Sequence, residues 1–133
     1  METLNLTSFE NAINSLESII LRYEKENDID IRDSVIQRFE YTYSMSLKMI
    51  SRFLKQNDIS EEISSMTFNE IIRRANQFGL LKTNLETWDE YRKKRNMTSH
   101  TYDEKIANDV VAIIPAFKDE AKFLLNRLKE KLG

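Results

Sequence analysis

The sequence contains no cysteine, a single proline and two glycines among its 133 residues. The lack of cysteine excludes disulfides, thiolate metal ligands and cysteine nucleophiles, and it fits a reducing compartment. So few prolines and glycines cannot supply the turns that a β-sandwich or barrel needs about every 8–12 residues. These absences argue against an all-β fold and turn attention to helices.

Long apolar runs are also missing. No stretch approaches the roughly 20 apolar residues of a membrane-spanning helix, and the first 20 residues lack a basic region followed by an apolar one. We therefore expect a cytoplasmic protein without membrane contact. The net charge is −2, so any contact with nucleic acid has to come from a local basic patch. The length fits one domain covering residues 1–133.

Apolar residues recur at steps of three and four along the chain, which is typical of amphipathic helices. The first stripe predicts a helix from about Ser8 to Glu26. The second predicts a long helix that opens with Asp30 or Asp33 as its capping residue and closes near residues 56–58. A short polar turn separates the two helices.

Capping patterns predict two further helices. Residues 67–70, Thr-Phe-Asn-Glu, match a capping box and open a short helix, and Gly79 stands where a left-handed C-terminal cap is expected. Residues 87–90, Thr-Trp-Asp-Glu, repeat the hydroxyl-to-acid spacing and open a helix that extends to about Asn96. Trp88 within it is expected to anchor the core.

The last helix is capped by Asp103, and its apolar stripe runs from Ile106 to Leu132. The stripe keeps its phase across Pro115 although proline removes a helical hydrogen bond, so we predict one helix kinked at Pro115. Five amphipathic helices joined by short polar turns predict an all-α fold, a five-helix antiparallel up-and-down bundle.

Residues 91–102 hold the most reactive chemistry, because they concentrate four cations, the only histidine and two tyrosines. On an unbroken helix Arg95 and His100 would point about 140° apart. The helix-breaking stretch from Thr98 to Thr101 supplies a turn that can bring both side chains to one place. We therefore expect a functional corner in this segment.

Arginine beside histidine is suited to cutting RNA. Imidazole can accept a proton from the ribose 2′-hydroxyl near neutral pH, and guanidinium can hold the phosphate with two hydrogen bonds. The alternative is a solvated basic helix end followed by a capping histidine. The acidic pairs Glu61-Glu62 and Asp103-Glu104 lack metal-ligand spacing and fit helix caps or solvated surface. We predict no metal and no cofactor.

Residues 95–102, Arg-Asn-Met-Thr-Ser-His-Thr-Tyr, resemble the Arg-x4-His-x-Tyr signature of HEPN-domain proteins. The resemblance is to the small HEPN proteins that are encoded beside minimal nucleotidyltransferases. Residues 35–43, 74–80 and 113–115 are similar to the same subfamily, so the resemblance covers about residues 5–132. One departure lies at residues 44–48, where many relatives have a small residue and a tryptophan before the lysine.

The resemblance implies a dimeric HEPN fold and a toxin that acts as a metal-independent endoribonuclease, neutralised by a minimal nucleotidyltransferase antitoxin. It implies that Arg95 and His100 cleave RNA, that Asn96 orders the turn and the phosphate, and that the antitoxin transfers AMP to Tyr102. The neighbouring cations expected to support phosphate binding are Arg92 and Lys94.

Two further expectations accompany this interpretation. RNA cleavage through a cyclic phosphate needs a base and an acid, yet each chain has one histidine, so we expect a homodimer whose two corners face each other. Its interface would draw on Tyr41, Tyr43 and Trp88. The alternative function is a non-catalytic, substrate-binding subunit of a two-component nucleotidyltransferase.

Overall fold

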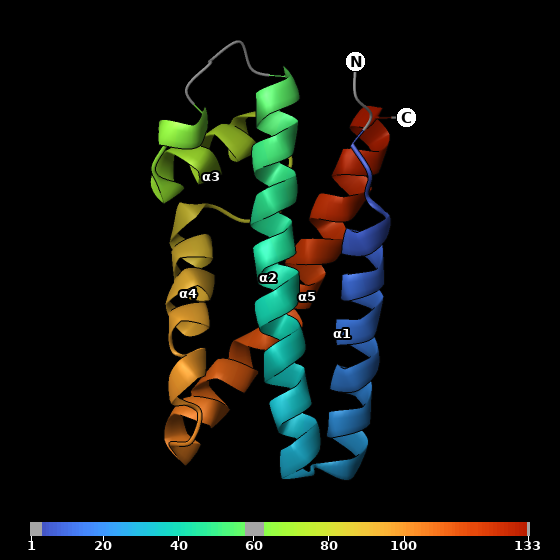
Figure 1. The fold of residues 1–133 in the computed structure, drawn as a ribbon, viewed down its shortest axis with the longest axis vertical. Helices are drawn as coiled ribbons and strands as arrows, with labels where there is room; N and C mark the ends of the chain where they lie inside the picture. Colours follow the sequence, from blue (N-terminus) through green and yellow to red (C-terminus); the bar gives the residue numbers. More distant parts are fainter. Residues whose placement is uncertain (1–3, 58–62, 133) are drawn as a thin grey trace.

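The computed structural model describes residues 4–57 and 63–132, and within them the chain forms five α-helices and two short 3₁₀ turns but no strand. The predicted all-α, five-helix bundle is confirmed (Figure 1). The elements in chain order are α1 (Thr7–Glu26), α2 (Ile29–Asn57), η1 (Ile63–Ser65), α3 (Phe68–Gln77), α4 (Leu85–Asn96), η2 (Thr98–His100) and α5 (Glu104–Leu132).

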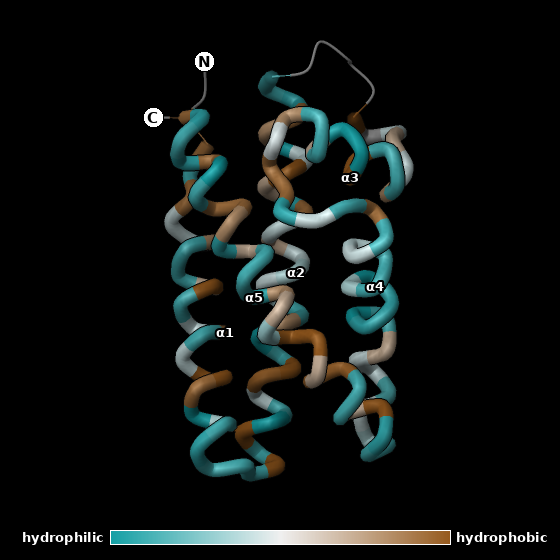
Figure 2. The backbone as a smooth tube through the Cα atoms, turned by 180° about the vertical axis from the view of Figure 1, so that it is seen from behind, coloured by the Kyte–Doolittle hydropathy of each residue, from teal (hydrophilic) through white to brown (hydrophobic). Residues whose placement is uncertain are grey.

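Helices α1, α2, α4 and α5 run alternately up and down, and α3 lies at the end of the bundle where α2 finishes and α4 begins (Figure 1). Hydrophobic and hydrophilic residues alternate along each helix, as amphipathic helices require (Figure 2). None of the helices in residues 4–57 and 63–132 has the length and apolarity that crossing a membrane would need.

The predicted caps of α3, Thr67 at its start and Gly79 at its end, are confirmed. The Thr67 hydroxyl accepts a hydrogen bond from the Glu70 backbone N–H at 3.2 Å. Gly79 adopts a left-handed φ of 74°, and the Leu80 N–H reaches the Ala75 carbonyl at 3.0 Å. This six-to-one bond satisfies a carbonyl that the end of the helix leaves free, and it requires the backbone freedom of glycine.

The predicted start of α2 is wrong by a few residues. The cap is Asp28, whose carboxylate accepts the N–H of Asp30 at 2.7 Å, and not Asp30 or Asp33. A capping side chain accepts hydrogen bonds from backbone N–H groups two or three residues ahead of it. Asp28 is the earliest acidic residue of this stretch and takes this role. The helix ends at Asn57, and residue 58 lies outside the described residues.

The predicted start of α4 is also too late. The cap is Asn84, whose side chain accepts the Thr87 N–H at 3.4 Å, so the helix opens at Leu85. The hydroxyl-to-acid spacing at residues 87–90 therefore falls inside the helix. Asn is as good a cap as threonine, and this earlier cap places Trp88 within the first turns of the helix.

The last helix begins as predicted, with the Asp103 carboxylate accepting the Lys105 N–H at 2.9 Å. It continues as one helix through Pro115. Buried apolar residues recur along this helix at helical spacing, among them Val110, Ile114, Ala121 and Leu125. The kink at Pro115 stays a prediction.

An aromatic cluster joins α2, α4 and α5 at the centre of the molecule. The Phe117 ring lies 5.2 Å from the rings of both Phe39 and Tyr91, and the Trp88 ring lies 5.5 Å edge-on from Tyr91. Trp88 has no exposed surface, so its predicted role as a core anchor is confirmed. Because aromatic rings prefer edge-to-face contacts, the cluster fixes the position of α4 relative to α2 and α5.

The same packing corrects the expected dimer interface. Trp88 and Tyr43 are 0% and 5% exposed, because both rings pack inside their own chain, so they cannot form an interface with a second copy. Tyr41 is 56% exposed. It is the one member of the predicted set that faces solvent.

Candidate functional site

Arg95 lies in the last turn of α4 and His100 at the end of η2, and the backbone of Met97 between them stays right-handed, with φ −89° and ψ −7°. That the two side chains meet at one place stays a prediction. Helix α4 ends at Asn96, and the Met97 N–H bonds back to the Lys94 carbonyl at 3.0 Å. The His100 N–H then reaches the Met97 carbonyl at 3.0 Å, which closes η2. We call residues 95–102 the α4–η2 corner, since both predicted catalytic side chains belong to it.

A buried threonine hydroxyl locks this corner to the helix. The Thr98 Oγ1 donates to the Arg95 carbonyl at 2.8 Å, and the Thr101 Oγ1 donates to the Thr98 carbonyl at 3.2 Å. Asn96, which was expected to order the turn, is exposed and has no side-chain hydrogen bond within residues 4–57 and 63–132. Sequence reasoning missed Thr98, although a hydroxyl three residues after the last helical arginine is a usable signal.

His100 and Tyr102 stand together on the outer side of the corner. The Tyr102 hydroxyl lies 3.5 Å from the His100 Nδ1, and the two rings meet edge-on with centroids 6.0 Å apart. Both side chains are exposed, Tyr102 to 85%. At 3.5 Å this contact is weak, so either group is available to a ligand.

The cations that precede the turn have different surroundings. Lys94 pairs with Glu90 at 3.1 Å, and the Arg92 guanidinium lies 4.8 Å above the Phe68 ring of α3. Arg95 is half-buried, and the part of the chain that the structure describes offers it no ion pair or ring contact. Its guanidinium is therefore available to an anion, whereas phosphate binding by Arg92 and Lys94 stays a prediction.

Arg95 and Arg92 lie near the seam between α4 and α2. Burial raises the pKa of the Tyr43 hydroxyl on α2 to about 12, while the positive charges of Arg92 and Arg95 act in the opposite direction. Both guanidiniums are therefore close enough to α2 for their charges to act on that hydroxyl.

A buried arginine on α2 ties the corner to the rest of the bundle. Both terminal nitrogens of Arg32 donate to the Glu104 carboxylate, at 2.9 and 3.1 Å. These hydrogen bonds hold the pKa of Glu104 below its ordinary value and raise that of Arg32. Because Glu104 opens α5 directly after the corner, the pair fixes where α5 begins. Sequence reasoning did not find this contact.

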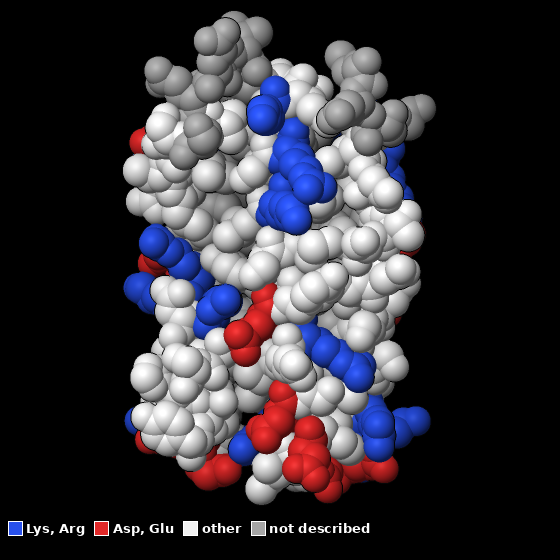
Figure 3. All heavy atoms as spheres, in the orientation of Figure 1, with Lys and Arg blue, Asp and Glu red and all other residues white. Residues whose placement is uncertain are grey.

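A polar hollow of about 330 Å³ separates the first half of α2 from the corner. Arg32, Glu40, Thr101, Tyr102 and Glu104 are among the residues that line it. Figure 3 shows acidic side chains gathered at this end of the molecule. Their charge repels phosphate, so we expect an anionic substrate to approach Arg95 from the α4 side.

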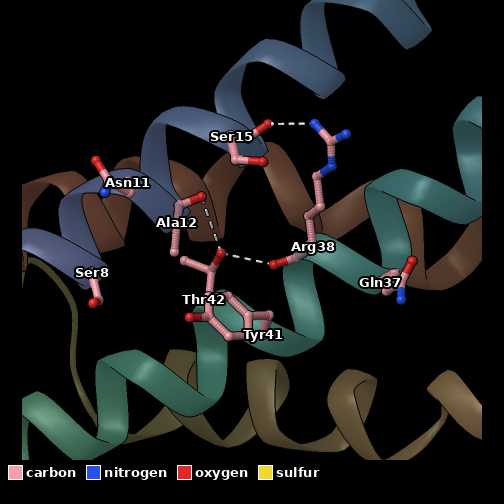
Figure 4. A pocket seen from close by; sticks show the side chains of 8 residues that line it. All are labelled: Ser8, Asn11, Ala12, Ser15, Gln37, Arg38, Tyr41 and Thr42. Carbon is pink, nitrogen blue, oxygen red and sulfur yellow. Dashed lines mark hydrogen bonds between the residues drawn. The ribbon is translucent and has the colours of Figure 1, made fainter.

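A second hollow, of about 450 Å³, lies between α1 and α2 (Figure 4). Its Arg38 donates to the Ser15 carbonyl at 3.1 Å, and its Thr42 hydroxyl donates to the Arg38 carbonyl at 2.7 Å. The lining contains no histidine or carboxylate. This hollow therefore has no group suited to proton transfer near neutral pH.

The described residues contain no group of three or more His, Asp or Glu side chains placed to hold a metal ion. Asp103 caps α5, which is one of the roles expected for that acidic pair, whereas Glu104 pairs with Arg32, a role that the sequence did not predict. The other acidic pair, Glu61-Glu62, lies outside the described residues.

Comparison with known proteins gives relatives that match most of the chain. A curated protein of Haemophilus influenzae, named probable ribonuclease HepT, is 37% identical over 98% of this chain and 95% of its own length. A solved structure from the same species, described as a substrate-binding domain of a nucleotidyltransferase, has a TM-score of 0.87 and 37% identity, covering 94% of this chain and 99% of that one.

A second solved structure, from Thermus thermophilus, has a TM-score of 0.75 at 27% identity and covers 91% of this chain and 98% of the other. The family described as nucleotidyltransferase substrate binding protein like matches residues 4–130. The resemblance inferred from residues 95–102 is thereby confirmed, and the chain belongs to this nucleotidyltransferase-associated HEPN family.

Proposed function

We propose that this chain is the toxin of a toxin–antitoxin pair and acts as a metal-independent endoribonuclease through Arg95 and His100. The observation that carries the proposal is the α4–η2 corner, where an exposed histidine follows, after one short turn, an arginine that has no ion pair among the described residues. The relative named probable ribonuclease HepT supports the activity, since it matches 98% of the chain.

In the proposed reaction the His100 imidazole accepts the proton of a ribose 2′-hydroxyl. The 2′-oxygen then forms a bond to phosphorus, and the bond from phosphorus to the 5′-oxygen breaks. The products are a 2′,3′-cyclic phosphate and a 5′-hydroxyl, whose proton comes from a general acid. Base and acid steps of this kind each contribute about 10²–10⁴-fold in rate.

Arg95 holds the phosphate during this step. Its guanidinium can give two parallel N–H donors to the non-bridging oxygens, which gain negative charge as the new bond forms. It has no competing ion pair among the described residues, so this binding breaks no existing contact. Arg92, Lys94 and Asn96 are proposed to support the same phosphate from the end of α4.

The general acid is proposed to come from a second copy of the chain. Each chain has one histidine, so a two-fold dimer with facing corners would supply a base from one copy and an acid from the other. Light scattering at micromolar concentration is expected to give twice the mass of 15.8 kDa. A stable monomer that still cuts RNA would exclude the shared site.

The proposed regulator is a minimal nucleotidyltransferase, which would bind the chain and transfer AMP from ATP to the Tyr102 hydroxyl. Tyr102 is 85% exposed and lies beside His100, so an adenylate there would add bulk and negative charge where RNA has to bind. Mass spectrometry after co-expression is expected to find the adduct on Tyr102. Inhibited protein without an adduct would point to inhibition by binding alone.

The test of the activity compares three purified proteins on cellular RNA in the presence of a chelator: wild type, His100→Ala and Ser99→Ala. Ser99 is an exposed neighbour on the same turn, which makes it the matched control. We expect wild type and Ser99→Ala to cut, and His100→Ala to be about 10²–10⁴-fold slower because it lacks the proton acceptor. Equal cutting by His100→Ala would refute the proposed role of His100.

The second candidate function is a non-catalytic, substrate-binding subunit of a two-component nucleotidyltransferase. It is favoured by the family description and by the description of the Haemophilus influenzae structure. The same experiment separates the two functions. Wild-type protein that never cuts RNA, but that raises the affinity of a partner nucleotidyltransferase for its acceptor, would support this second function.

A further inference from the structure

The second half of α2 carries a line of cations that the proposed reaction does not use. Lys48, Arg52 and Lys55 follow one another at steps of four and three residues, so they share one face of the helix. All three are exposed. Figure 3 shows a basic stripe along this part of α2, and we call these three residues the α2 basic stripe.

The α2 basic stripe has no counterion among the residues that the structure describes. None of its members forms an ion pair within residues 4–57 and 63–132, whereas Lys93 and Lys94 on α4 pair with Asp89 and Glu90. Like charges at this spacing repel each other and weaken a helix. In a chain with a net charge of −2, such a stripe is a local excess that an external anion can neutralise.

The surroundings of the stripe favour a polyanion over a protein surface. Protein interfaces centre on buried apolar and aromatic side chains. The large hydrophobic side chains that the structure shows exposed are Leu21, Ile29, Tyr41 and Tyr102, and none of them lies in residues 44–57. A protein partner would therefore find charge here but no anchoring side chain.

The length of the stripe suits a nucleic acid strand. With a rise of 1.5 Å per residue, Lys48 and Lys55 lie roughly 10 Å apart along the helix axis. In a stacked, helical strand the axis rises about 3.4 Å per nucleotide, so that length spans about three phosphates. Three cations can thus each meet a phosphate of one continuous strand.

The stripe also shares a face of the molecule with cations of α4, because Figure 3 shows basic side chains over the second half of α2 and over α4 in one view. The positive charges of Arg92 and Arg95 act on the Tyr43 hydroxyl of α2. Lys48 follows five residues later, about 7.5 Å further along the same helix and about 140° around its axis, on the exposed side of α2. We propose that the α2 basic stripe binds the phosphate backbone of the RNA strand next to the bond that is cut. This inference rests on the proposed ribonuclease function and locates the substrate on the molecule.

The test measures RNA binding in a His100→Ala background, which keeps the RNA intact. The stripe variant combines Lys48→Gln, Arg52→Gln and Lys55→Gln. The matched control removes the same charge elsewhere, with Lys25→Gln, Lys122→Gln and Lys131→Gln. The probe is a fluorescein-labelled, single-stranded 20-nucleotide RNA of mixed sequence, and anisotropy is followed between 50 and 200 mM KCl, conditions chosen because phosphate contacts are salt-dependent.

We expect the stripe variant to lose about tenfold or more in affinity at low salt, and its plot of log affinity against log salt to be less steep by about 2, because each lost phosphate contact removes roughly 0.7 of slope. The control is expected to keep the slope of the His100→Ala parent. Circular dichroism checks that all proteins are equally helical.

Each other outcome has a separate meaning. If the stripe variant and the control bind the RNA equally, the inference is overturned, while the ribonuclease proposal stands if wild type still cuts. If wild type does not cut but the stripe variant loses affinity as expected, the nuclease proposal fails and the stripe remains an RNA-binding surface. If the variant loses a co-expressed nucleotidyltransferase and keeps its RNA affinity, the stripe binds that protein and the inference is overturned.

Discussion

Helix α2 borders two hollows that differ in what they can do. The hollow toward α1 measures about 450 Å³, and the hollow toward the α4–η2 corner about 330 Å³. Each holds an arginine of α2, Arg38 in the first and Arg32 in the second, and in both cases the guanidinium is bonded to the protein itself. Neither the volume of a hollow nor the presence of an arginine therefore explains why the two hollows differ in what they can do.

The two hollows differ in the side chains at their edges. In the α1–α2 hollow the polar groups form hydrogen bonds within the protein, as the Thr42 hydroxyl does with the Arg38 carbonyl. At the corner, backbone groups and Thr98 satisfy the turn. Among the residues that the structure describes, Arg95 has no ion pair, and the exposed His100 and Tyr102 share one weak contact at 3.5 Å. A rigid backbone with uncommitted side chains is the arrangement that binding and catalysis need.

The largest expected effect separates an uncommitted arginine from a committed one. Arg95→Ala should slow RNA cutting by about 10²–10⁴-fold, because the phosphate loses its charged donors in the transition state. Arg38→Ala, in the other hollow, should leave the rate within about twofold of wild type, since it removes no group that contacts substrate. Single-turnover rates on one RNA measure both. Equal losses would mean that the effect comes from the fold and not from the site.

The next effect compares Tyr43, which is buried on α2, with Tyr41, which is exposed on the opposite face of the same helix. Burial raises the pKa of Tyr43 to about 12 and does the same for Tyr91 on α4. The folded state therefore favours the neutral phenol, so the stabilisation is complete below pH 10 and is lost as the pH rises through 12. Two pKa units correspond to about 2.7 kcal/mol for each residue.

Urea unfolding at pH 9 and pH 11.5 tests this sign. Tyr43→Phe should reduce the loss of stability between the two pH values, because phenylalanine cannot ionise in the unfolded chain. Tyr41→Phe is the control, since its side chain is 56% exposed in the α1–α2 hollow. The same alkaline loss in all three proteins would show that burial of Tyr43 does not drive it.

The sequence predicts the helical framework well because each helix displays its buried face as a local pattern. The stripe through Phe39 and Tyr43, the Thr67 cap and the left-handed Gly79 depend on residues within a few positions of one another, and the structure confirms them. The turn before His100 is also local. Choosing among neighbouring capping residues was less successful, since Asp28 competes with Asp30 for the same role.

Contacts between distant residues could not be predicted in this way. Arg32 and Glu104 are 72 positions apart, and no periodicity relates an arginine in one helix to a carboxylate that opens another. The same limit explains the error on Trp88 and Tyr43. A stripe shows which side of a helix is buried, but not whether its own chain or a second copy covers it.

The pair formed by Arg32 and Glu104 gives an intermediate effect. Arg32→Met should lower the free energy of unfolding by about 1–3 kcal/mol, because a buried charged hydrogen-bonding group is lost and the start of α5 is released. Arg38→Met, whose guanidinium is half-buried and bonds one carbonyl, should cost less than about 1 kcal/mol. Chemical unfolding at pH 7 compares the two. A larger loss for Arg38→Met would reverse the assignment of Arg32 as the main anchor.

Acid should reduce the difference in the free energy of unfolding between wild type and Arg32→Met. Because Arg32 holds the pKa of Glu104 below its ordinary value, the pair contributes stability above the ordinary pKa of a glutamate, and this contribution is lost as the pH falls through the lowered value. Repeating the unfolding of wild type and Arg32→Met at pH 3 should therefore give a smaller difference than at pH 7. An unchanged difference would show that Arg32 acts through packing alone.

The smallest effect comes from two threonines with the same local geometry. The Thr98 hydroxyl donates to the carbonyl of Arg95 at 2.8 Å, and the Thr42 hydroxyl donates to the carbonyl of Arg38 at 2.7 Å. Valine keeps the shape and removes the donor, so each Thr→Val change should lower stability by roughly 0.5–1.5 kcal/mol.

Only Thr98→Val loosens the corner, and it alone should slow RNA cutting, by about tenfold or less, because a small shift of His100 weakens its alignment with the 2′-hydroxyl. Parallel unfolding and single-turnover assays on the two variants separate stability from positioning, and an equal loss of rate in Thr42→Val would show that stability alone sets the activity.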